Sequence, residues 1–243
     1  MHVVTFILLI IFVLSVLKVF IYKIFFDGEI RAVMERDPAA TGTLSVIFTT
    51  PGLHAIFYYR IAHTLGRLRV PFVPRVISQF ARWLTGVEIH PGATIGKGLF
   101  IDHGMGVVIG ETAILGDNVT LFQGVTLGGT GKQKGKRHPT LGNNIVVGAG
   151  ANILGDIQIG DNVSIGANAV VVRDVPANST VVGVPGRIAS REGRRVPGIN
   201  LDHSSLPDPL TQALEKLQHE IDKIEQEIKD FGESEHGKRS EKP

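Results

Sequence analysis

Aliphatic residues recur every six positions through the middle of the chain. The recurring positions are Ile89, Ile95 and Ile101, then Ile109, Leu115, Leu121 and Leu127, then Leu141, Val147, Ile153, Ile159, Ile165 and Val171. Three places after each stands a corner position. Eleven of these thirteen corners are Gly, Asn or Asp, which adopt positive φ at low cost, and the exceptions are Thr112 and Thr130. This period cannot form one stripe on a helix, so it predicts short strands joined by tight corners.

Three such strands per turn predict a triangular parallel β-helix of about eighteen residues per coil, with neighbouring coils roughly 4.8 Å apart. The repeat resembles that of the hexapeptide left-handed β-helices. The left hand follows from this resemblance alone, because parallel crossovers are in general right-handed. The expected fold class is mainly β: a left-handed β-helix over residues 87–190, preceded by a small helical domain and followed by a tail with a heptad helix.

The period of six breaks twice. The spacing is eight between Ile101 and Ile109, and fourteen between Leu127 and Leu141, which predicts an extruded loop over 128–140. Interruptions of a solenoid map to loops on one face, often the binding face. The loop carries four basic residues but lacks the pattern of a Walker phosphate loop. It could bind phosphates or a carboxylate, or it could be a solvated charged loop.

Residues 27–86 predict a small helical domain. In 53–68 the apolar positions recur at helical spacing, at Leu53, Ile56, Phe57, Ile61, Leu65 and Leu68. In 74–85 Pro74 suits a first helical turn and Gly86 suits the end of a helix. The apolar face of this second helix consists of Val76, Ile77, Phe80, Ala81 and Leu84.

Residues 1–26 form a hydrophobic segment. Residues 3–17 would reach only about 22 Å as a helix, short of the roughly 30 Å hydrocarbon core of a bilayer. An extension to Tyr22 suffices if Lys18 snorkels toward the headgroups. Lysines follow the segment, so we predict a membrane-anchoring helix over 3–22 that leaves the protein cytoplasmic, on the inner face. A start-codon artefact and a helix buried in an oligomer are the alternatives, and a cleaved signal peptide is not expected.

The tail, residues 191–243, contains a heptad helix over about 208–231. Its apolar positions alternate spacings of four and three, at Leu210, Leu214, Leu217, Ile221, Ile224, Ile228 and Phe231. The pattern favours a three-stranded coiled coil, and the alternative is one amphipathic helix packed on its own protomer.

Composition narrows the chemistry. The chain has no cysteine, which excludes disulfides, thiolate metal sites and a cysteine nucleophile. A net charge of +2 does not indicate a nucleic-acid-binding protein. The charge is unevenly distributed, because residues from Asn200 onward carry eleven acidic and six basic groups and the remainder of the chain carries +7. Of the 29 glycines, 22 lie in 86–193, which places the surplus in the repeat and its loop.

The motifs around the two breaks resemble the bacterial serine O-acetyltransferases. The resemblance is closest in VEIHPGATIGKGLFIDHGMGVVIGET (87–112) and FQGVTLGGTGKQKGKRHP (122–139), and it extends over roughly residues 25–200. Members of this family transfer acetyl from acetyl-CoA to the hydroxyl of L-serine, the first step of cysteine biosynthesis. The resemblance therefore implies this activity, with acetyl-CoA as a co-substrate and no permanently bound cofactor.

The resemblance also implies roles for individual residues. His103 matches the catalytic histidine, Glu88 the carboxylate that orients it, and His138 a second active-site histidine. A base is needed because the serine hydroxyl is a weak nucleophile, and histidine titrates in the right range. The remaining matched positions are Arg137 for the serine carboxylate, Asp37 and Asp102 for its ammonium group, and Gly129, Gly148, Ala149, Ala167 and Arg187 for CoA.

Assembly follows from the same resemblance. Acetyl-CoA in such enzymes lies between two β-helices of a homotrimer, and helical domains join two trimers into a hexamer. The short segment before Asp37 leaves the hexamer open. Some relatives bind O-acetylserine sulfhydrylase through a terminal isoleucine, whereas this chain ends in Pro243, which argues against that complex.

Three alternatives remain at this stage. A hexapeptide acetyltransferase acting on a sugar or another amine would share the repeat. A trimeric β-helix carbonic anhydrase would need His90, His103 and His138 to converge on zinc, whereas the serine O-acetyltransferase resemblance implies no metal. A non-catalytic scaffold would show no turnover.

Overall fold

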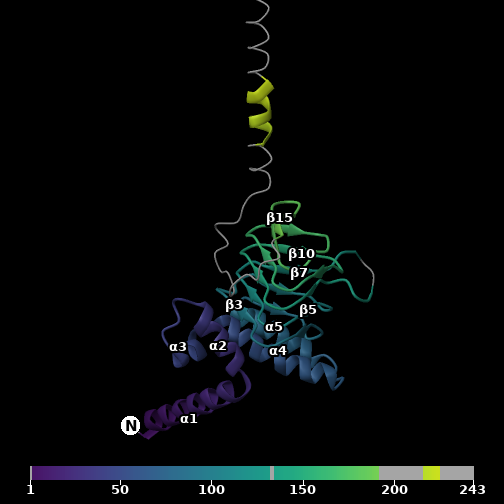
Figure 1. Cartoon of the computed structure of the whole chain (residues 1–243). Helices are drawn as coiled ribbons and strands as arrows, with labels where there is room; N and C mark the ends of the chain where they lie inside the picture. The colour runs from purple at the N-terminus through teal and green to yellow at the C-terminus, as the bar shows by residue number, and fades with distance from the viewer. Residues whose placement is uncertain (1, 132–133, 192–215, 225–243) are drawn as a thin grey trace, which may run out of the picture. The chain divides into compact units, whose positions relative to one another are not determined.

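The computed structural model describes residues 2–131, 134–191 and 216–224, in two compact units, 1–206 and 207–243. In the first unit a group of helices precedes short strands that wind into a triangular coil (Figure 1). The helices are α1 (His2–Phe25), α2 (Asp27–Arg36), α3 (Thr43–Thr49), α4 (Pro51–Arg67) and α5 (Val73–Thr85).

The strands form three sheets, one for each side of the triangle. Sheet A contains β1 (Glu88–Ile89), β4 (Val108–Ile109), β7 (Thr126–Gly128), β10 (Asn152–Leu154) and β13 (Val170–Val171). Sheet B contains β2 (Thr94–Ile95), β5 (Ile114–Leu115), β8 (Thr140–Leu141) and β11 (Gln158–Ile159). Sheet C contains β3 (Phe100–Ile101), β6 (Thr120–Leu121), β9 (Val146–Val147), β12 (Ser164–Ile165), β14 (Ser179–Val182) and β15 (Arg187–Arg191).

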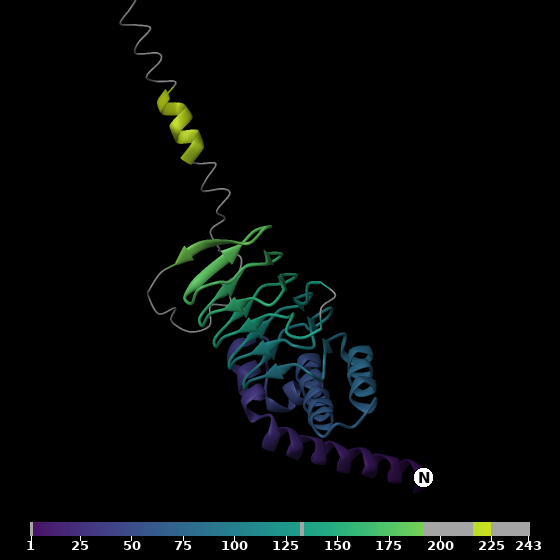
Figure 2. The ribbon, with the colours of Figure 1, turned by 90° about the vertical axis from the view of Figure 1, so that its right-hand side faces the viewer.

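The strand register reproduces the period read from the sequence. Partners in successive parallel strands are 18 residues apart at Val108↔Thr126 and at Asn152↔Val170. The offset grows to 20 at Glu88↔Val108 and to 26 at Thr126↔Asn152, because the two insertions lie between these strands. The triangular parallel β-helix is therefore confirmed, and each insertion leaves the strands above and below it in phase. Figure 2 shows the stacked coils from the side.

The inward aliphatic residues fill the interior of the coil. Ile109, Leu121, Leu127 and Ile153 have no exposed surface, and the small residues that follow corners, such as Ala93, are equally buried. Because each coil places the same kind of side chain above the previous one, the core is a continuous column.

The three corners of the triangle differ in conformation. We call them A/B, B/C and C/A after the sheets they join. Eight of the thirteen predicted corner residues have positive φ, all of them at the B/C and C/A corners. The five at the A/B corner (Gly92, Thr112, Thr130, Asp156 and Asp174) do not, so the expectation of a left-handed corner was wrong for that side. There the first two coils close with ordinary four-residue turns, such as the Ala93 N–H donating to the His90 carbonyl at 3.0 Å.

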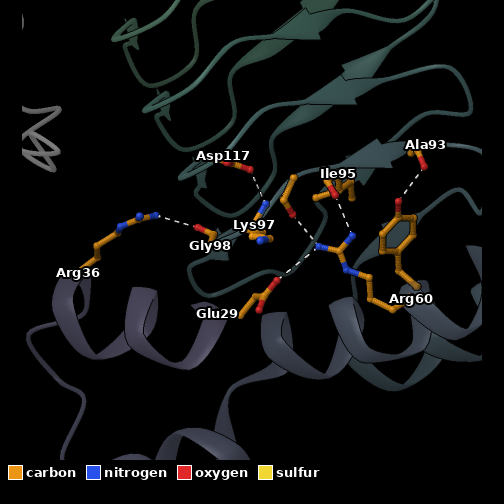
Figure 3. Close-up of polar contacts among 10 residues, drawn as sticks. Glu29, Arg36, Arg60, Ala93, Ile95, Lys97, Gly98 and Asp117 are labelled. Carbon is orange, nitrogen blue, oxygen red and sulfur yellow. Dashed lines mark hydrogen bonds and ion pairs between the residues drawn. The ribbon is translucent and has the colours of Figure 1, made fainter. Parts of the chain in front are cut away.

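The helices close the lower end of the coil. Backbone N–H and carbonyl groups pair between neighbouring coils in both directions, as the N–H of Thr94 does with Ala113 and the carbonyl of Lys97 does with Asn118. The first-coil carbonyls that point away from the second coil have no coil below them. Side chains of the helical domain donate to them instead. The pairs are Ser78 with Ile89, His63 with Pro91, Tyr59 with Ala93, Arg60 with Ile95 and Gly96, and Arg36 with Gly98, at 2.6–3.1 Å. Figure 3 shows the contacts of Arg36, of Arg60 and at the Ala93 carbonyl.

Burial supports these donors. Tyr59 is buried, and burial raises the pKa of its hydroxyl to about 12, so the group stays protonated and keeps donating. Arg60 also lies 3.4 Å from the buried carboxylate of Glu29, which balances its charge. The helical domain and the β-helix are thereby joined by hydrogen bonds as well as by apolar packing.

Helix α5 packs with its small and polar side inward. Pro74, Ser78, Ala81 and Thr85 are buried beneath the first coil, whereas Phe80 and Leu84 of the predicted apolar face are exposed. The physical reason is the cap: Ser78 must reach the Ile89 carbonyl, and Thr85 donates to the carbonyl of Ala81 and accepts from the N–H of Val87.

In the second unit residues 216–224 are helical, within the predicted heptad segment. Leu217, Ile221 and Ile224 are about half exposed, so this apolar edge is open to a partner helix. The other heptad positions lie outside the described residues, and the coiled coil stays a prediction.

We expect Arg60→Met to lower the free energy of unfolding by about 2–3 kcal/mol, because two carbonyls and the Glu29 carboxylate lose their donor. Urea denaturation followed by circular dichroism measures this change. Arg67→Met is the matched control, since Arg67 is exposed in the last turn of the same helix. An equal loss in both variants would contradict the cap.

Candidate functional site at two corners of the coil

The insertion at the C/A corner presents His103 to solvent. Its side chain is 73% exposed and its backbone has φ of 57°. A non-glycine residue in this region is uncommon and marks a locally constrained backbone. Gly104 follows with φ of 75°, and a Cβ there would lie 2.9 Å from Val87. The extra residues therefore push His103 outward, while Gly104 lets the chain return close to the core.

Acidic groups lie beside this corner. The Asp102 carboxylate is 3.9 Å from Nε2 of His103. Glu88 lies on β1, where it pairs with Arg82 at 3.0 Å and makes no contact with His103 in the described chain. The predicted Glu88–His103 pair thus stays a prediction. Asp37 caps the C-terminus of α2, and its carboxylate accepts from the N–H of Ala39.

The long insertion leaves the A/B corner and returns at His138, which Thr112 holds in place. The Thr112 hydroxyl lies 3.0 Å from the N–H of Arg137, 3.2 Å from the N–H of His138 and 2.9 Å from Nδ1 of His138. A hydroxyl has two lone pairs and one proton, so it accepts from the two N–H groups and donates to Nδ1. The N–H of Thr112 also donates to Nδ1 at 3.1 Å.

These contacts decide the tautomer of His138, and its surroundings decide its protonation state. Because Nδ1 accepts, the proton of the neutral ring is on Nε2. The ring is buried, and burial lowers the pKa of His138, as do the nearby charges of Arg137 and Lys136, partly opposed by Glu111. His138 is therefore a neutral Nε2–H donor at neutral pH. A Cβ on Gly110 would lie 2.0 Å from its ring, so that position must be glycine.

Two basic residues of the loop, Lys136 and Arg137, are paired with acids. Arg137 donates to Glu111 at 2.6 Å, and this hydrogen bond lowers the pKa of Glu111. Lys136 lies 3.4 Å from Asp156 and also donates to the His138 carbonyl. The guanidinium of Arg137 is about one-third exposed, so an anionic ligand could compete with Glu111 for it.

Thr112 and Glu111 were missed by reasoning from the sequence. Thr112 did carry a signal, because it and Thr130 are the two predicted corners at which the repeat does not use Gly, Asn or Asp. The structure shows the reason for this exception: the corner residue anchors the loop. Glu111 carried no comparable signal.

One chain does not bring the two histidines together. His103 precedes β4 and Thr112, which contacts His138, follows it. His103 and His138 therefore lie at opposite ends of the strands of sheet A. Five extended residues span roughly 16 Å, and no contact joins the two groups among the described residues.

The predicted CoA positions also divide between the corners. Ala149 and Ala167 lie at the C/A corner, in the coils above His103, and the N–H of Asn168 donates to the Ala149 carbonyl. Gly148 lies beside them, and a Cβ there would be 2.6 Å from the N of Ala167. Gly129 lies at the A/B corner against Arg137 and His138, and Arg187 begins β15.

No group of three or more His, Cys, Asp or Glu side chains within the described ranges is placed to hold a metal ion. The chemistry available at the two corners is therefore that of an exposed histidine with a nearby carboxylate, a fixed N–H donor and a guanidinium.

Comparison with known proteins supplies the chemical context. The family model for the bacterial transferase hexapeptide (six repeats) matches residues 138–173. A serine acetyltransferase of Staphylococcus epidermidis is 57% identical over 203 residues, which are 83% of this chain and 95% of that protein.

Two solved structures bear on ligands. Soybean serine acetyltransferase complexed with serine is 43% identical, with a TM-score of 0.65, and the match covers 66% of this chain and 66% of that one, just under two thirds. Serine acetyltransferase from Brucella abortus in complex with coenzyme A is also 43% identical, with a TM-score of 0.67, and the match covers 69% and 67%.

We expect His138 to titrate below the ordinary histidine value, because burial and the adjacent cations disfavour its charged form. Thr112→Val removes the hydroxyl donor to neutral Nδ1 and should raise this pKa, whereas Thr112→Ser keeps the donor and should leave it low. Histidine-selective ¹³C NMR against pH measures both, with the signal assigned by its loss in His138→Gln. An unchanged pKa in Thr112→Val would contradict the anchoring role.

Proposed function

Because the chain belongs to the serine acetyltransferase family, we propose that it transfers acetyl from acetyl-CoA to the hydroxyl of L-serine, giving O-acetyl-L-serine and CoA. The observation that carries this proposal is the pair of insertions, since each presents one of the two histidines that the chemistry requires. The relatives with bound serine and bound coenzyme A support the two substrates. A sugar acceptor or CO₂ hydration has no comparable support.

We propose that the site is completed by a neighbouring copy of the chain in a homotrimer. His103 and His138 lie at opposite ends of the strands of sheet A, so one protomer holds two half-sites. In a threefold ring each protomer meets its neighbours through two different surfaces. The C/A corner of one protomer would then face the A/B corner of the next across a groove between them. A dimer of two trimers remains an open extension of this assembly.

His103 acts as the general base in this proposal. It takes the proton from the serine hydroxyl as the oxygen attacks the thioester carbonyl, and it returns the proton to the CoA sulfur as the carbon–sulfur bond breaks. Asp102 is near enough to favour the imidazolium that forms between these steps. Glu88, whose partner is now Arg82, would turn toward His103 once the groove is formed. No acyl-enzyme is required.

The A/B corner supplies positioning. The Nε2–H of His138 donates to the reacting oxygen, and its fixed tautomer means that no proton has to be rearranged first. Arg137 exchanges Glu111 for the serine carboxylate, to which its planar guanidinium can donate two parallel hydrogen bonds. Asp102 and Asp37 are the proposed partners of the serine ammonium group.

Acetyl-CoA is proposed to lie along the C/A corner above His103. Gly148, Ala149 and Ala167 leave little side chain there, which allows a long pantetheine arm to approach the backbone. Gly129 would contribute from the neighbouring A/B corner, and Arg187 would meet the phosphates near the upper end.

We also propose that α1 tethers the protein to the inner face of a membrane. Val3–Phe25 is the candidate span among the described residues, and its apolar window is not buried in the fold. Lysines at the following end favour a cytoplasmic catalytic domain.

His103→Ala should lower kcat with serine by roughly 10²–10⁴, because the hydroxyl loses its base. Thiol release from acetyl-CoA measures this rate, with sugars and other amino acids as parallel acceptors. His219→Ala is the control, since His219 is exposed in the second unit. Near-wild-type turnover by His103→Ala would disprove the role of His103, and turnover with a sugar but not with serine would disprove the substrate.

Mixing the two inactive variants tests the shared site. His103→Ala and His138→Ala protomers assembled at equal ratio should recover about one quarter of wild-type activity, because one neighbouring pair in four joins an intact C/A corner to an intact A/B corner. Each variant alone should stay inactive. No recovery in verified mixed trimers would place the whole site within one chain.

A further inference from the structure

Helix α5 exposes a large apolar face. We define the α5 apolar face as Val73, Val76, Phe80, Trp83 and Leu84, of which Trp83 is 79% exposed. A surface helix normally turns its apolar stripe toward the core, and here the small and polar stripe occupies that position. A contiguous exposed apolar patch marks an interaction site in a soluble domain.

The α5 apolar face continues onto α1 through a chain of aromatic contacts. Ring centroids are 5.9 Å apart between Trp83 and Phe80, 5.7 Å between Phe80 and Tyr58, and 5.4 Å between Tyr58 and Phe57. Phe57 then stacks on Tyr22 of α1 at 5.2 Å. Figures 1 and 2 both show α1 and α5 at the end of the coil opposite β15.

A hollow of about 550 Å³ lies between the same elements. Its lining includes Leu84 of α5 and Leu14 and Leu17 of α1. The exposed apolar surface of α5 and that of α1 therefore adjoin and form one surface at this end of the domain.

The length of the free part of α1 restricts where this surface can lie. Tyr22 and Phe26 are buried against the domain, and the Lys18 ammonium lies 3.2 Å from His54 and 4.7 Å from the centroid of Phe48. Lys18 is therefore held by the domain and does not extend toward headgroups as the sequence suggested. Only residues 3–17 precede these contacts, and they reach about 22 Å of a hydrocarbon core of roughly 30 Å. For α1 to insert deeply, the base of the domain must enter the interfacial layer.

The charge of this region suits an anionic surface. Residues 38–87 contain five arginines and no acidic residue. Arg67, Arg69 and Arg75 are exposed in the last turn of α4, in the link to α5 and in the first turn of α5, and Arg67 and Arg75 also line a hollow with His90 of the first coil. Basic groups around an apolar face are the pattern of helices that lie in the headgroup region of anionic membranes.

We propose that the α5 apolar face docks on the surface of an anionic lipid bilayer beside the inserted α1, with Trp83 in the headgroup layer. The inference rests on the proposed tether of α1 and adds a second contact to it. It assigns the base of the domain to the membrane, and it leaves the two catalytic corners above the bilayer, since they lie in the coils. Tryptophan is the residue type that favours this depth.

The chain offers its own probe, because Trp83 is the only tryptophan. Full-length protein is mixed with vesicles of phosphatidylcholine, with or without one-third phosphatidylglycerol. On the anionic vesicles we expect a blue-shifted emission, quenching by lipids brominated near the headgroup, and a several-fold loss of quenching by aqueous acrylamide. Flotation of the vesicles reports binding through α1 separately.

Three results would overturn the proposal. Protein that floats while Trp83 stays open to acrylamide and insensitive to brominated lipid is held by α1 alone. Protein that does not float, with Trp83 unchanged, binds no membrane. A Trp83 already shielded without vesicles, in particles that sediment as two trimers, is covered by a second copy of the chain.

A charge-reversed variant tests the contribution of the three exposed arginines, Arg67, Arg69 and Arg75. Arg67→Glu with Arg69→Glu and Arg75→Glu should abolish the preference for anionic vesicles and restore acrylamide quenching of Trp83. Arg173→Glu is the matched control, because Arg173 is exposed at the far end of β13. An unchanged preference for anionic vesicles in the charge-reversed variant would also overturn the proposal.

Acetyl transfer to serine by the unmodified protein is measured in parallel. If Trp83 docks on the vesicles but no acetyl is transferred, the proposed enzyme activity is wrong and the docking stands. If acetyl is transferred but Trp83 does not dock, the docking alone is wrong.

Discussion

The carbonyl groups of the first coil must be satisfied, and the arrangement of the helical domain follows from this requirement. A parallel coil satisfies each edge with the next coil, and an uncovered edge is a site for unwanted pairing. Here Ser78, His63, Tyr59, Arg60 and Arg36 supply the missing donors. Because these donors come from α2, α4 and α5, the positions of three helices are tied to one row of acceptors. The side of α5 that faces inward is a consequence of this requirement.

The same regularity explains where the chemistry lies. Every coil repeats one inward pattern. A segment of chain can therefore project beyond the regular surface of the coil only where residues are inserted without a change of register. The two insertions do this, and the strands on either side stay in phase. They occupy different corners, which gives each protomer two half-sites. Thr112 shows how a corner residue is reused: its hydroxyl satisfies two loop N–H groups and fixes the tautomer of His138.

Catalysis and membrane contact are separated along the molecule. The histidines lie at corners of the coil, whereas the apolar and basic groups of α1 and α5 lie below its first coil. The cap connects the two regions through hydrogen bonds from α2, α4 and α5 to the first coil. Residues 38–87 contain no acidic residue, whereas the tail is acidic. These opposite charges nearly cancel, so the small net charge of the chain does not reflect the charge of either segment.

The sequence by itself determined the coil, its period and both insertions, because a hexad repeat constrains each residue locally and the breaks are visible as changes in spacing. The candidate histidines followed from the resemblance of the motifs at these breaks to the serine O-acetyltransferases. The sequence also predicted α4 and α5, but not which side of α5 packs, since the choice depends on the Ile89 carbonyl, which is brought near only by folding. The state of His138 depended on Thr112, 26 residues away. Likewise the separation of His103 from His138, the pairing of Glu88 with Arg82 and the fixing of Lys18 on His54 are contacts between distant segments. Only the tertiary structure decided these, because spacing along a chain carries no information about the partners that folding brings into contact.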